Sequence, residues 1–332
     1  MKEFFGRTEL GEEANIYRIK SGDAYADISD FGATLVRFYV CGRDIVGGYD
    51  TLDGYLKDDS HQGGTIGRVA NRVEDAEFFM DGVRYSLPDN SGGCCLHGGR
   101  GFDRRMWKVT RHTKDKILLE YTAEDGEEGF PARLDVKVCY TLSGGDLRID
   151  YEAMPHGKTP ISLTNHTYFN LDGLGGDILN HEVIIDADEY TYLDGRLVAI
   201  GGRVAVSGTA HDFTTPHKIG ERIGGDFIGY DNNFVLNKTK IFDFSHKKLH
   251  FAASAQSGDI RLSVFTDQDG VQFYIGNFLG GEPDFKGGVK RIRHGAFCFE
   301  TQSEPNSIRR GEGFYDIGDI YRHTCVYRVE RV

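Results

Sequence analysis

One glutamate lies in an apolar setting where it could act in proton transfer. Glu300 belongs to the short run 297–302, and the two-residue period of a strand places it on the same face as Cys298, opposite two phenylalanines. A carboxylate among apolar neighbours must be paired with a cation, bind its proton more tightly, or lie in a cleft where it reacts. Two interpretations follow: Glu300 is a general acid–base group, or it is a structural glutamate neutralised by an arginine such as Arg72 or Arg291.

Two histidines could supply a second proton carrier. His166 lies in residues 159–169, where polar and apolar side chains alternate, and the polar face of such a strand is typical of the floor of a binding cleft. His97 precedes Gly98 and Gly99, and glycine permits close backbone approach beside the imidazole. The alternative for His166 is a histidine hydrogen-bonded at a strand end, and the alternative for His97 is an ordinary glycine-rich loop.

Two histidines and one carboxylate also match the composition of a metal triad. The sequence has no HExxH or other short ligand spacing, however, so we expect no metal site. It likewise lacks the Gly-x-Ser-x-Gly elbow of serine hydrolases and the glycine motifs that cradle phosphates. Metal catalysis and serine hydrolase chemistry are therefore both disfavoured.

The elements that must position these groups are β-strands. The 44 glycines, 17 tyrosines and 22 phenylalanines among 332 residues favour strands and turns over helices. The clearest strands are 133–142 and 147–153, which alternate polar and apolar side chains around a turn at 143–146 and so predict a hairpin. Further strands are predicted at 24–29, 34–40, 117–121, 181–185 and 321–329.

Two Asp-Gly dipeptides predict further tight hairpin turns, because this pair readily adopts the positive φ angles of such turns. They are Asp81-Gly82, between strands 77–80 and 83–87, and Asp269-Gly270, between strands 262–265 and 271–275. Helical periodicity is confined to short segments at 52–57 and 216–223. Many short strands without a linker or repeat indicate one all-β domain over residues 1–332, a large antiparallel β-sandwich or barrel with few short helices.

Composition and charge restrict the possible partners. The 39 basic and 51 acidic side chains give a net charge of -12, which disfavours nucleic acid and anionic membrane surfaces. The apolar stretches are too short to cross a bilayer, and the N-terminal residues do not resemble a secretory signal. The six cysteines have no CxxC spacing and are expected to be reduced. We expect a cytoplasmic protein, monomeric or homodimeric.

Five segments, spread in order over nearly the whole chain, form a more specific pattern than any one of them. They are Gly67-Arg68-Val69-Ala70-Asn71-Arg72-Val73; Leu96-His97-Gly98-Gly99 with Gly101-Phe102-Asp103-Arg104-Arg105-Met106-Trp107; Leu163-Thr164-Asn165-His166-Thr167-Tyr168-Phe169-Asn170-Leu171; Tyr230-Asp231-Asn232-Asn233-Phe234; and Glu300-Thr301-Gln302. Together they resemble the corresponding segments of the aldose 1-epimerases, also called galactose mutarotases.

The resemblance implies a fold, an activity and roles for individual residues. It implies a galactose mutarotase-like supersandwich with an open sugar cleft, in which the α and β anomers of a free aldohexose such as galactose or glucose interconvert without a cofactor. By their places in the segments, Glu300 would be the general base on the C1 hydroxyl and His166 the general acid on the ring oxygen. The residues that would hold the sugar hydroxyls or position this pair are His97, Asn71, Arg72, Asp231 and Gln272.

The implied chemistry suits these two groups. Opening a cyclic hemiacetal removes a proton from the anomeric hydroxyl and adds one to the ring oxygen, after which the aldehyde rotates and closes from its other face. With reference pKa values of about 4.3 and about 6.5, a glutamate is ionised near neutrality and an imidazole can be tuned to hold a proton. We therefore expect Glu300 to start as the carboxylate and His166 as the proton donor.

Three positions depart from the family pattern and bear on the choice of sugar. Asn232 stands where the family commonly has histidine, Val69 replaces a frequent aromatic residue, and Glu304 places a charge where an aromatic residue is usual. The implied acid and base are unaffected. The alternatives left open are an epimerase for another or a phosphorylated sugar, a sugar-binding protein without turnover, and a glycosidase, for which two positioned carboxylates are usual.

Overall fold

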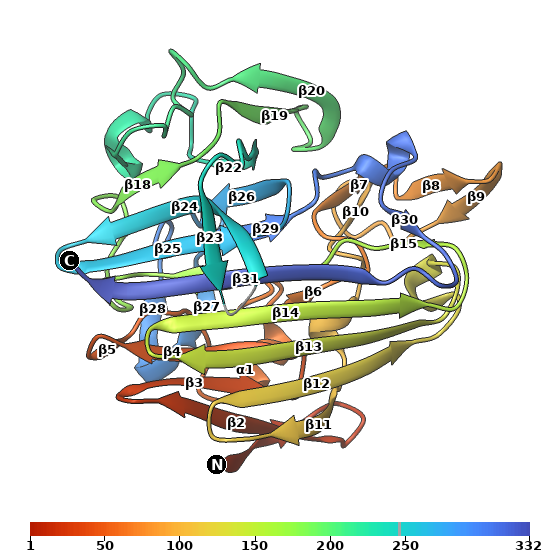
Figure 1. Cartoon of the computed structure of the whole chain (residues 1–332), viewed down its shortest axis with the longest axis horizontal. Helices are drawn as coiled ribbons and strands as arrows, with labels where there is room; N and C mark the ends of the chain where they lie inside the picture. The colour runs from red at the N-terminus through yellow and green to blue at the C-terminus, as the bar shows by residue number, and fades with distance from the viewer. Residues whose placement is uncertain (245–246) are drawn as a thin grey trace.

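Three antiparallel sheets dominate the computed structural model, which describes residues 1–244 and 247–332 (Figure 1). The largest has ten strands in the order β11-β12-β13-β14-β31-β25-β24-β18-β21, with β23 paired to β24. Their bounds are β11 Lys108–His112, β12 Lys116–Ala123, β13 Leu134–Ser143, β14 Asp146–Pro155, β31 Tyr321–Arg331, β25 Ile260–Thr266, β24 Lys247–Ser257, β18 Glu182–Ile185, β21 His217–Lys218 and β23 Ile241–Phe244.

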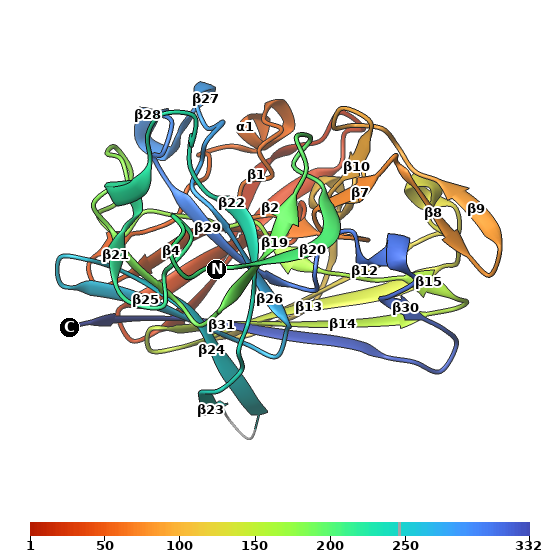
Figure 2. The same cartoon turned by 90° about the horizontal axis from the view of Figure 1, so that it is seen from above.

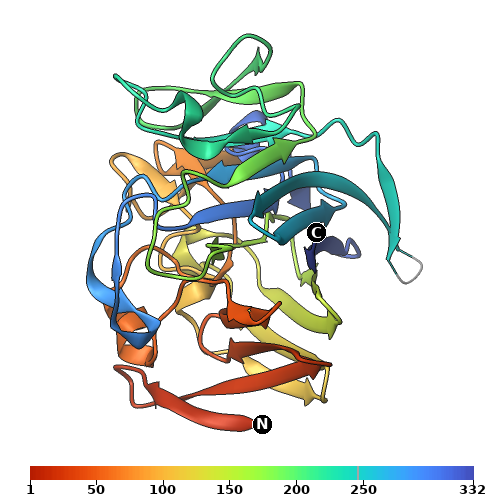
Figure 3. The same ribbon diagram turned by 90° about the vertical axis from the view of Figure 1, so that its left-hand side faces the viewer.

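The other two large sheets have six and five strands. The six-stranded sheet has the order β17 Tyr168–Phe169, β29 Phe297–Gln302, β26 Gly270–Tyr274, β22 Asp231–Val235, β19 Glu189–Leu193 and β20 Ala199–Ala205. The five-stranded sheet follows the chain as β1 Lys2–Arg7, β2 Glu13–Ser21, β3 Ala24–Ser29, β4 Thr34–Val40 and β5 Arg43–Asp44. In Figure 3 these red N-terminal strands lie at one end of the molecule and the green β19–β20 region at the other.

Short paired strands and turns complete the described structure. The pairs are β6 Thr65–Ile66 with β16 Thr164–Asn165, β7 Arg72–Glu74 with β10 Cys94–Leu96, β8 Glu77–Met80 with β9 Val83–Ser86, β15 Thr159–Pro160 with β30 Phe314–Tyr315, and β27 Gly281–Phe285 with β28 Val289–Arg291. Helix α1 spans Leu52–Lys57, and 3-10 turns lie at Phe102–Arg104, Glu127–Gly129, Ile219–Arg222, Lys286–Gly288 and Ser307–Arg310. None of the helices in the described ranges has the length and apolar character needed to span a bilayer.

The main core lies between the ten-stranded sheet and the two other large sheets. Figure 2 shows this arrangement from above, with β13, β14 and β31 on one side and β2, β22 and β29 on the other. Buried apolar side chains reach the core from each sheet, for example Val138, Ile28 and Phe273. Removing such side chains from water is the main driving force for the fold, which is the all-β sandwich that the sequence predicts.

Several local predictions are confirmed. The turn at 143–146 joins β13 to β14 in a hairpin, and Asp81 and Gly82, with φ angles of 51° and 80°, form the tight turn between β8 and β9. The alternation predicted for 297–302 also holds: the two phenylalanines are buried in the main core, whereas Cys298 and Glu300 face the other side of the sheet. Strand alternation therefore separates the core from the site within a single strand.

The hairpin predicted at Asp269-Gly270 is wrong. This dipeptide joins β25 in the ten-stranded sheet to β26 in the six-stranded sheet, so the two strands are not paired with each other. Each finds other partners, because β25 pairs with β24 and β31 while β26 pairs with β22 and β29. Just before the turn, Oδ1 of Asp267 accepts the N–H of Thr324 at 2.9 Å, which holds the corner against the ten-stranded sheet.

Candidate active site

A cavity of about 230 Å³ lies on the face of the six-stranded sheet that points away from the main core. Strands β29, β26 and β22 form its floor, and β7, β10 and the turn between β16 and β17 contribute to its walls. All the residues that the sequence and the resemblance indicate line this cavity: Glu300, His166, His97, Asn71, Arg72, Asp231 and Gln272. Segments far apart in the chain therefore converge on one site.

The floor of the cavity holds Glu300 and Gln272 side by side. The two residues are direct partners in the register of β26 and β29. Nε2 of Gln272 donates to Oδ1 of Asp231 on β22, at 2.7 Å. Oε2 of Glu300 and Oε1 of Gln272 are buried and have no hydrogen-bond partner within the described ranges. These two oxygens can accept hydrogen bonds from a ligand.

His166 lies in the turn between β16 and β17, where backbone hydrogen bonds hold it in place. Its N–H donates to the carbonyl of Gly64 at 3.0 Å, and its carbonyl accepts the N–H of Gly63 at 2.8 Å. The imidazole stacks on Tyr168, with ring centroids 4.9 Å apart. Nε2 lies 3.7 Å from Oε1 of Glu300, so both groups can reach neighbouring oxygens of one ligand.

The single polar strand predicted over 159–169 is broken into β15, β16 and β17. Of its polar face, only His166 and Tyr168 reach the cavity. Ser162 is tied instead to the neighbouring segment, because its N–H donates to the carbonyl of Arg68 at 3.0 Å. The turn is therefore what directs His166 toward β29.

His97, Asn71 and Arg72 come from the paired strands β7 and β10 and the residues beside them. The N–H of Asn71 donates to Nδ1 of His97 at 3.2 Å. Because Nδ1 accepts this bond, the proton of the neutral ring lies on Nε2, which can donate to a ligand oxygen. The close approach expected beside His97 is confirmed at Gly98: its φ is 77°, and a Cβ there would lie 2.5 Å from the carbonyl oxygen of Gly67.

The atoms of His97, His166 and Glu300 that could bind a metal ion lie within 4.8 Å of one another. A metal-binding histidine normally donates from the ring nitrogen that does not hold the metal. In His97 that nitrogen would be Nδ1, which instead accepts the N–H of Asn71. This hydrogen bond favours His97 as a donor to a ligand oxygen over His97 as a metal ligand.

Burial changes the proton affinities of the central pair. It raises the pKa of Glu300 well above its ordinary value; the charge of Asp231 adds to this effect and that of Arg72 opposes it. Burial also lowers the pKa of His166 to about 3, with a further contribution from the charge of His61. Both groups therefore favour their neutral forms, with the proton on Glu300.

This distribution differs from the expectation based on reference pKa values, which places the proton on His166. The physical reason is that a charged carboxylate and a charged imidazole both lose hydration when they are buried. In either arrangement the pair shares one proton and so contains one donor and one acceptor. Neither arginine considered as a structural partner forms an ion pair with Glu300 in the described residues. Arg291 pairs with Asp58, and Arg72 lines the cavity.

The sequence does not single out several residues that line the cavity, among them His61, Tyr274 and Phe278. Nδ1 of His61 lies 2.8 Å from Oδ2 of Asp103, and its ring centroid lies 4.7 Å from that of His97. Phe278 is 67% exposed at the edge of the cavity. The glycines that follow His61 are a signal that could have drawn attention to it, whereas no local pattern marks Phe278.

The three departures from the family pattern do not line the cavity. Val69 is buried in a separate apolar cluster. Oδ1 of Asn232 lies 3.0 Å from Nε2 of His211, and Oε2 of Glu304 accepts from Arg203 at 2.9 Å. None of the three therefore contacts a ligand bound within the lining residues of the cavity.

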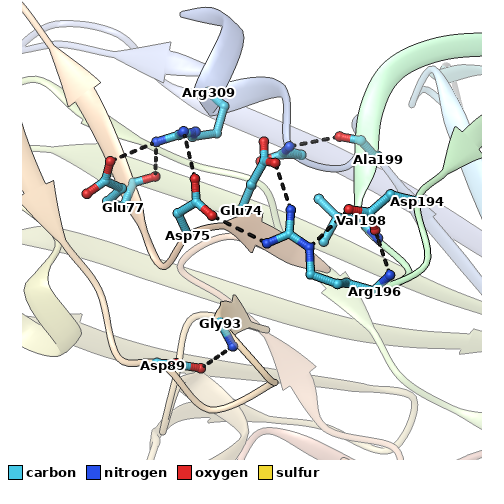
Figure 4. A network of polar contacts seen from close by, with 11 residues as sticks. Glu74, Asp75, Glu77, Asp89, Gly93, Asp194, Arg196, Val198, Ala199 and Arg309 are labelled. Atoms are coloured by element: carbon cyan, nitrogen blue, oxygen red, sulfur yellow. Dashed lines mark hydrogen bonds and ion pairs between the residues drawn. The ribbon is translucent and has the colours of Figure 1, made fainter.

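A set of ion pairs lies beside the cavity and joins the β19–β20 hairpin to β7 (Figure 4). We call it the rim network; its members are Glu74, Asp75, Glu77, Asp194, Arg196 and Arg309. Arg196 reaches Oε1 of Glu74 at 2.9 Å and Oδ2 of Asp194 at 3.0 Å. Asn306 adds to it by accepting the N–H of Glu74 at 3.1 Å. The network thus braces the strand that begins with Arg72.

Comparisons with known proteins agree with this fold. The sequence profile of the aldose 1-epimerase family matches residues 15–328. Galactose mutarotase from Rattus norvegicus is 39% identical over 324 residues, covering 94% of this chain and 93% of the relative. Aldose 1-epimerase from Escherichia coli (strain K12) is 34% identical over 270 residues, covering 77% and 76%.

Solved structures show the same fold. The GalM/aldose epimerase homologue from C. elegans superposes with a TM-score of 0.87 at 26% identity, covering 96% of this chain and 99% of the other. Galactose 1-epimerase from Lactobacillus acidophilus has a TM-score of 0.87 at 24% identity, covering 100% and 98%. Fold and site together define a galactose mutarotase-like β-sandwich with a cavity that contains Glu300 and His166. The chain belongs to the aldose 1-epimerase family, the isomerases that interconvert the anomers of aldoses.

Proposed function

We propose that this chain interconverts the α and β anomers of free aldohexoses, such as galactose and glucose, and that Glu300 and His166 exchange the protons. The observation that carries this proposal is the 3.7 Å separation between Oε1 of Glu300 and Nε2 of His166 in a cavity of about 230 Å³. The relatives named galactose mutarotase support an aldohexose as the substrate.

Ring opening uses the form of the pair in which Glu300 is ionised and His166 is protonated. Glu300 accepts the proton of the C1 hydroxyl, Nε2 of His166 donates a proton to the ring oxygen, and the bond from C1 to the ring oxygen breaks to give the aldehyde. Rotation about the bond from C1 to C2 presents the other face of the carbonyl. The C5 hydroxyl then attacks C1, His166 takes its proton back, and Glu300 returns its proton to the former carbonyl oxygen.

Binding of the sugar favours this reactive form over the neutral one. Hydroxyl groups that donate to Glu300 stabilise its carboxylate, and the charge of Arg72 already acts in the same direction. The 3.7 Å separation from His166 allows the proton to move to Nε2 through one bridging hydroxyl. Each positioned proton transfer is typically worth about 10² to 10⁴ in rate.

The remaining predicted residues are suited to hold a neutral polyol. Nε2 of His97 is a donor, and Oε1 of Gln272 is a buried acceptor without a partner in the described structure. The hydrogen bond from Gln272 to Asp231 orients both side chains, leaving the second oxygen of the carboxylate to accept from a hydroxyl. Asn71 and Arg72 supply further donors from β7 and the residue before it.

The charge of the cavity favours free sugars over phosphorylated ones. Three carboxyl groups, those of Asp59, Asp231 and Glu300, line it, while Arg72 is the single arginine or lysine among the lining residues of the described chain. A phosphate would need cationic contacts beyond Arg72, and the carboxyl groups supply none. The same surroundings suit hydroxyl groups, which donate to carboxylates.

The test is polarimetry of a freshly dissolved pure anomer. We expect the wild-type protein to accelerate mutarotation of α-galactose or α-glucose, and the double variant Glu300→Gln with His166→Asn to leave the spontaneous rate unchanged. Hexose 6-phosphates in the same assay should be accelerated less than the free sugars. Wild-type protein that binds sugar without accelerating anomer exchange would contradict the proposal.

We also propose that residues 1–332 form one domain, which acts in the cytoplasm as a monomer or homodimer. The family match over 15–328, which leaves only short ends, supports the single domain. The six cysteines carry free thiols, five of them buried, which supports a reducing compartment. Size-exclusion chromatography with light scattering distinguishes the two assembly states.

A further inference from the structure

The two ring nitrogens of His166 face two side chains of the same strand. Nε2 lies 3.7 Å from Oε1 of Glu300, and Nδ1 lies 3.5 Å from Sγ of Cys298. Cys298 and Glu300 are two residues apart on β29, so their side chains leave the sheet on the same face. One strand therefore contacts both nitrogens of the proton carrier.

The surroundings of Cys298 make its thiol a neutral partner. The side chain is fully buried in an apolar cluster separate from the main core. This cluster includes Tyr168 and Tyr274, the partners of Cys298 in the register of β17 and β26. Burial, with the charges of Glu300 and Asp231, raises the pKa of this thiol well above its ordinary value. The sulfur therefore stays protonated and offers His166 a weak, uncharged acceptor.

The other cavity histidine with a side-chain partner is held differently. Nδ1 of His61 faces the carboxylate of Asp103 at 2.8 Å, which is a charged acceptor when ionised. A thiol gives no comparable charge stabilisation. His166 can therefore release a proton readily, as a general acid must, while its ring orientation is still defined.

The acid–base cycle requires that the proton of the neutral His166 ring lie on Nδ1. Nε2 must give a proton to the ring oxygen and later take one back, so its lone pair must be free after the first step. That requires the neutral ring to keep its proton on Nδ1 throughout. A group that accepts a hydrogen bond from Nδ1–H, without taking the proton, meets this demand.

We propose that Cys298 is the positioning residue of His166: its sulfur accepts the hydrogen bond from Nδ1–H and so reserves Nε2 for proton exchange with Glu300 and the sugar. This proposal rests on the proposed function for its consequence in catalysis. The assignment of the ring proton itself does not depend on the activity, because the contact from Cys298 to His166 is present in the protein alone.

The first test is kinetic and uses a pair of substitutions at one position. In Cys298→Ala, Nδ1–H loses its partner, and we expect kcat to fall roughly 10- to 100-fold with little change in KM, as when a functional histidine loses the group that orients it. In Cys298→Ser the hydroxyl keeps an acceptor, so most of the lost kcat should return. Cys325→Ala, which removes a buried thiol from β31 away from the cavity, is the matched control and should keep wild-type kcat.

The second test measures the ring proton directly. In protein labelled with ¹⁵N-histidine, with His166 assigned by the loss of its signals in His166→Asn, we expect the ring shifts of the Nδ1–H tautomer in the wild type and in Cys298→Ser. Cys298→Ala should shift the population toward Nε2–H. A wild-type Nε2–H tautomer, or a Cys298→Ala protein with wild-type kcat and wild-type shifts, would overturn the proposal. Failure of the proposed function is distinguishable, because wild-type protein itself would then lack mutarotase activity.

Discussion

The cavity and the rim network lie side by side on β7, but their polar groups differ in exposure and in pairing. In the rim network the guanidinium of Arg196 faces carboxylates at 2.9 and 3.0 Å, and its side chain is 43% exposed. In the cavity Glu300 is 2% exposed, and its Oε2 has no partner among the residues described. The network pairs its charges in contact with water, whereas the cavity keeps polar atoms buried and unpaired.

This difference distinguishes polar groups that pair with each other from polar groups that are available to a ligand. Exposed ion pairs exchange hydration for a modest attraction, so they contribute little to stability and little to chemistry. Buried polar atoms without partners destabilise the fold, and they are explained when a ligand supplies the missing hydrogen bonds. The unpaired oxygens of Glu300 and Gln272 lie in one cavity, where a single ligand can supply both missing hydrogen bonds.

Substitution of the central pair should have the largest effect on activity. Glu300→Gln removes the proton acceptor, and His166→Asn removes the donor, so we expect each to lower the rate of mutarotation by about 10² to 10⁴. Because each change removes an ionisable group from a buried position, thermal melts should show no major loss of stability. Undiminished polarimetric rates in both variants would refute their roles.

The pH dependence of kcat/KM should show a wide pH range in which Glu300 and His166 together hold one proton. Burial raises the pKa of Glu300, so the first proton stays bound to higher pH than on an ordinary glutamate, and the pKa of about 3 for His166 delays the second proton until strongly acidic pH. We therefore expect kcat/KM to be level from mildly acidic to neutral pH and to fall about tenfold per pH unit on the alkaline side, where the pair loses its shared proton. A fall in kcat/KM as the pH rises from about 5 to about 7 in a pH-stable protein would show instead that the pair loses its shared proton where the reference values imply.

A smaller effect is expected at a residue that only holds the sugar. Gln272→Ala removes an unpaired acceptor and the hydrogen bond to Asp231, and one hydrogen bond is worth about 0.5–1.5 kcal/mol, so KM should rise roughly 2- to 12-fold with kcat less affected. Gln268→Ala, in the corner before β26 and outside the cavity, is the matched control. Equal KM values for the two variants would place Gln272 outside the substrate contacts.

The smallest effect should come from the rim network. Arg196→Ala removes three carboxylate contacts but no buried group, so we expect wild-type mutarotation and only a slight fall in the thermal midpoint. That fall should shrink in high salt, because exposed pairs are screened. A large loss of kcat in this variant would show that the network positions Arg72, and the contrast between the two regions would then be less sharp.

Much of the fold and of the candidate site could be predicted from local pattern. Alternation along 297–302 separated Glu300 from the core, and alternation around the turn at 143–146 predicted a hairpin that the structure contains. The residues carried over by family resemblance all line one cavity. Their roles in catalysis stay predictions until the variants above are measured.

Features that depend on distant neighbours could not be predicted in this way. Asp269-Gly270 has the residues of a hairpin turn, yet its flanking strands pair in different sheets. His61 meets Asp103 only because the loops at 61 and 103 pack together, and no pattern within either loop announces the contact. The contact of Cys298 with Nδ1 of His166 likewise depends on how the turn after β16 packs over β29.

The local sequence was thus sufficient to predict most strands and the chemical groups of this protein. The position of the proton shared by Glu300 and His166, by contrast, depends on the tertiary structure. Side-chain alternation and turn preference act over a few residues of chain, so they can be read locally. The proton affinity of Glu300 and His166 depends on lost hydration and on the charges of Asp231, Arg72 and His61. Those terms exist only once the sheets and loops have closed around the pair.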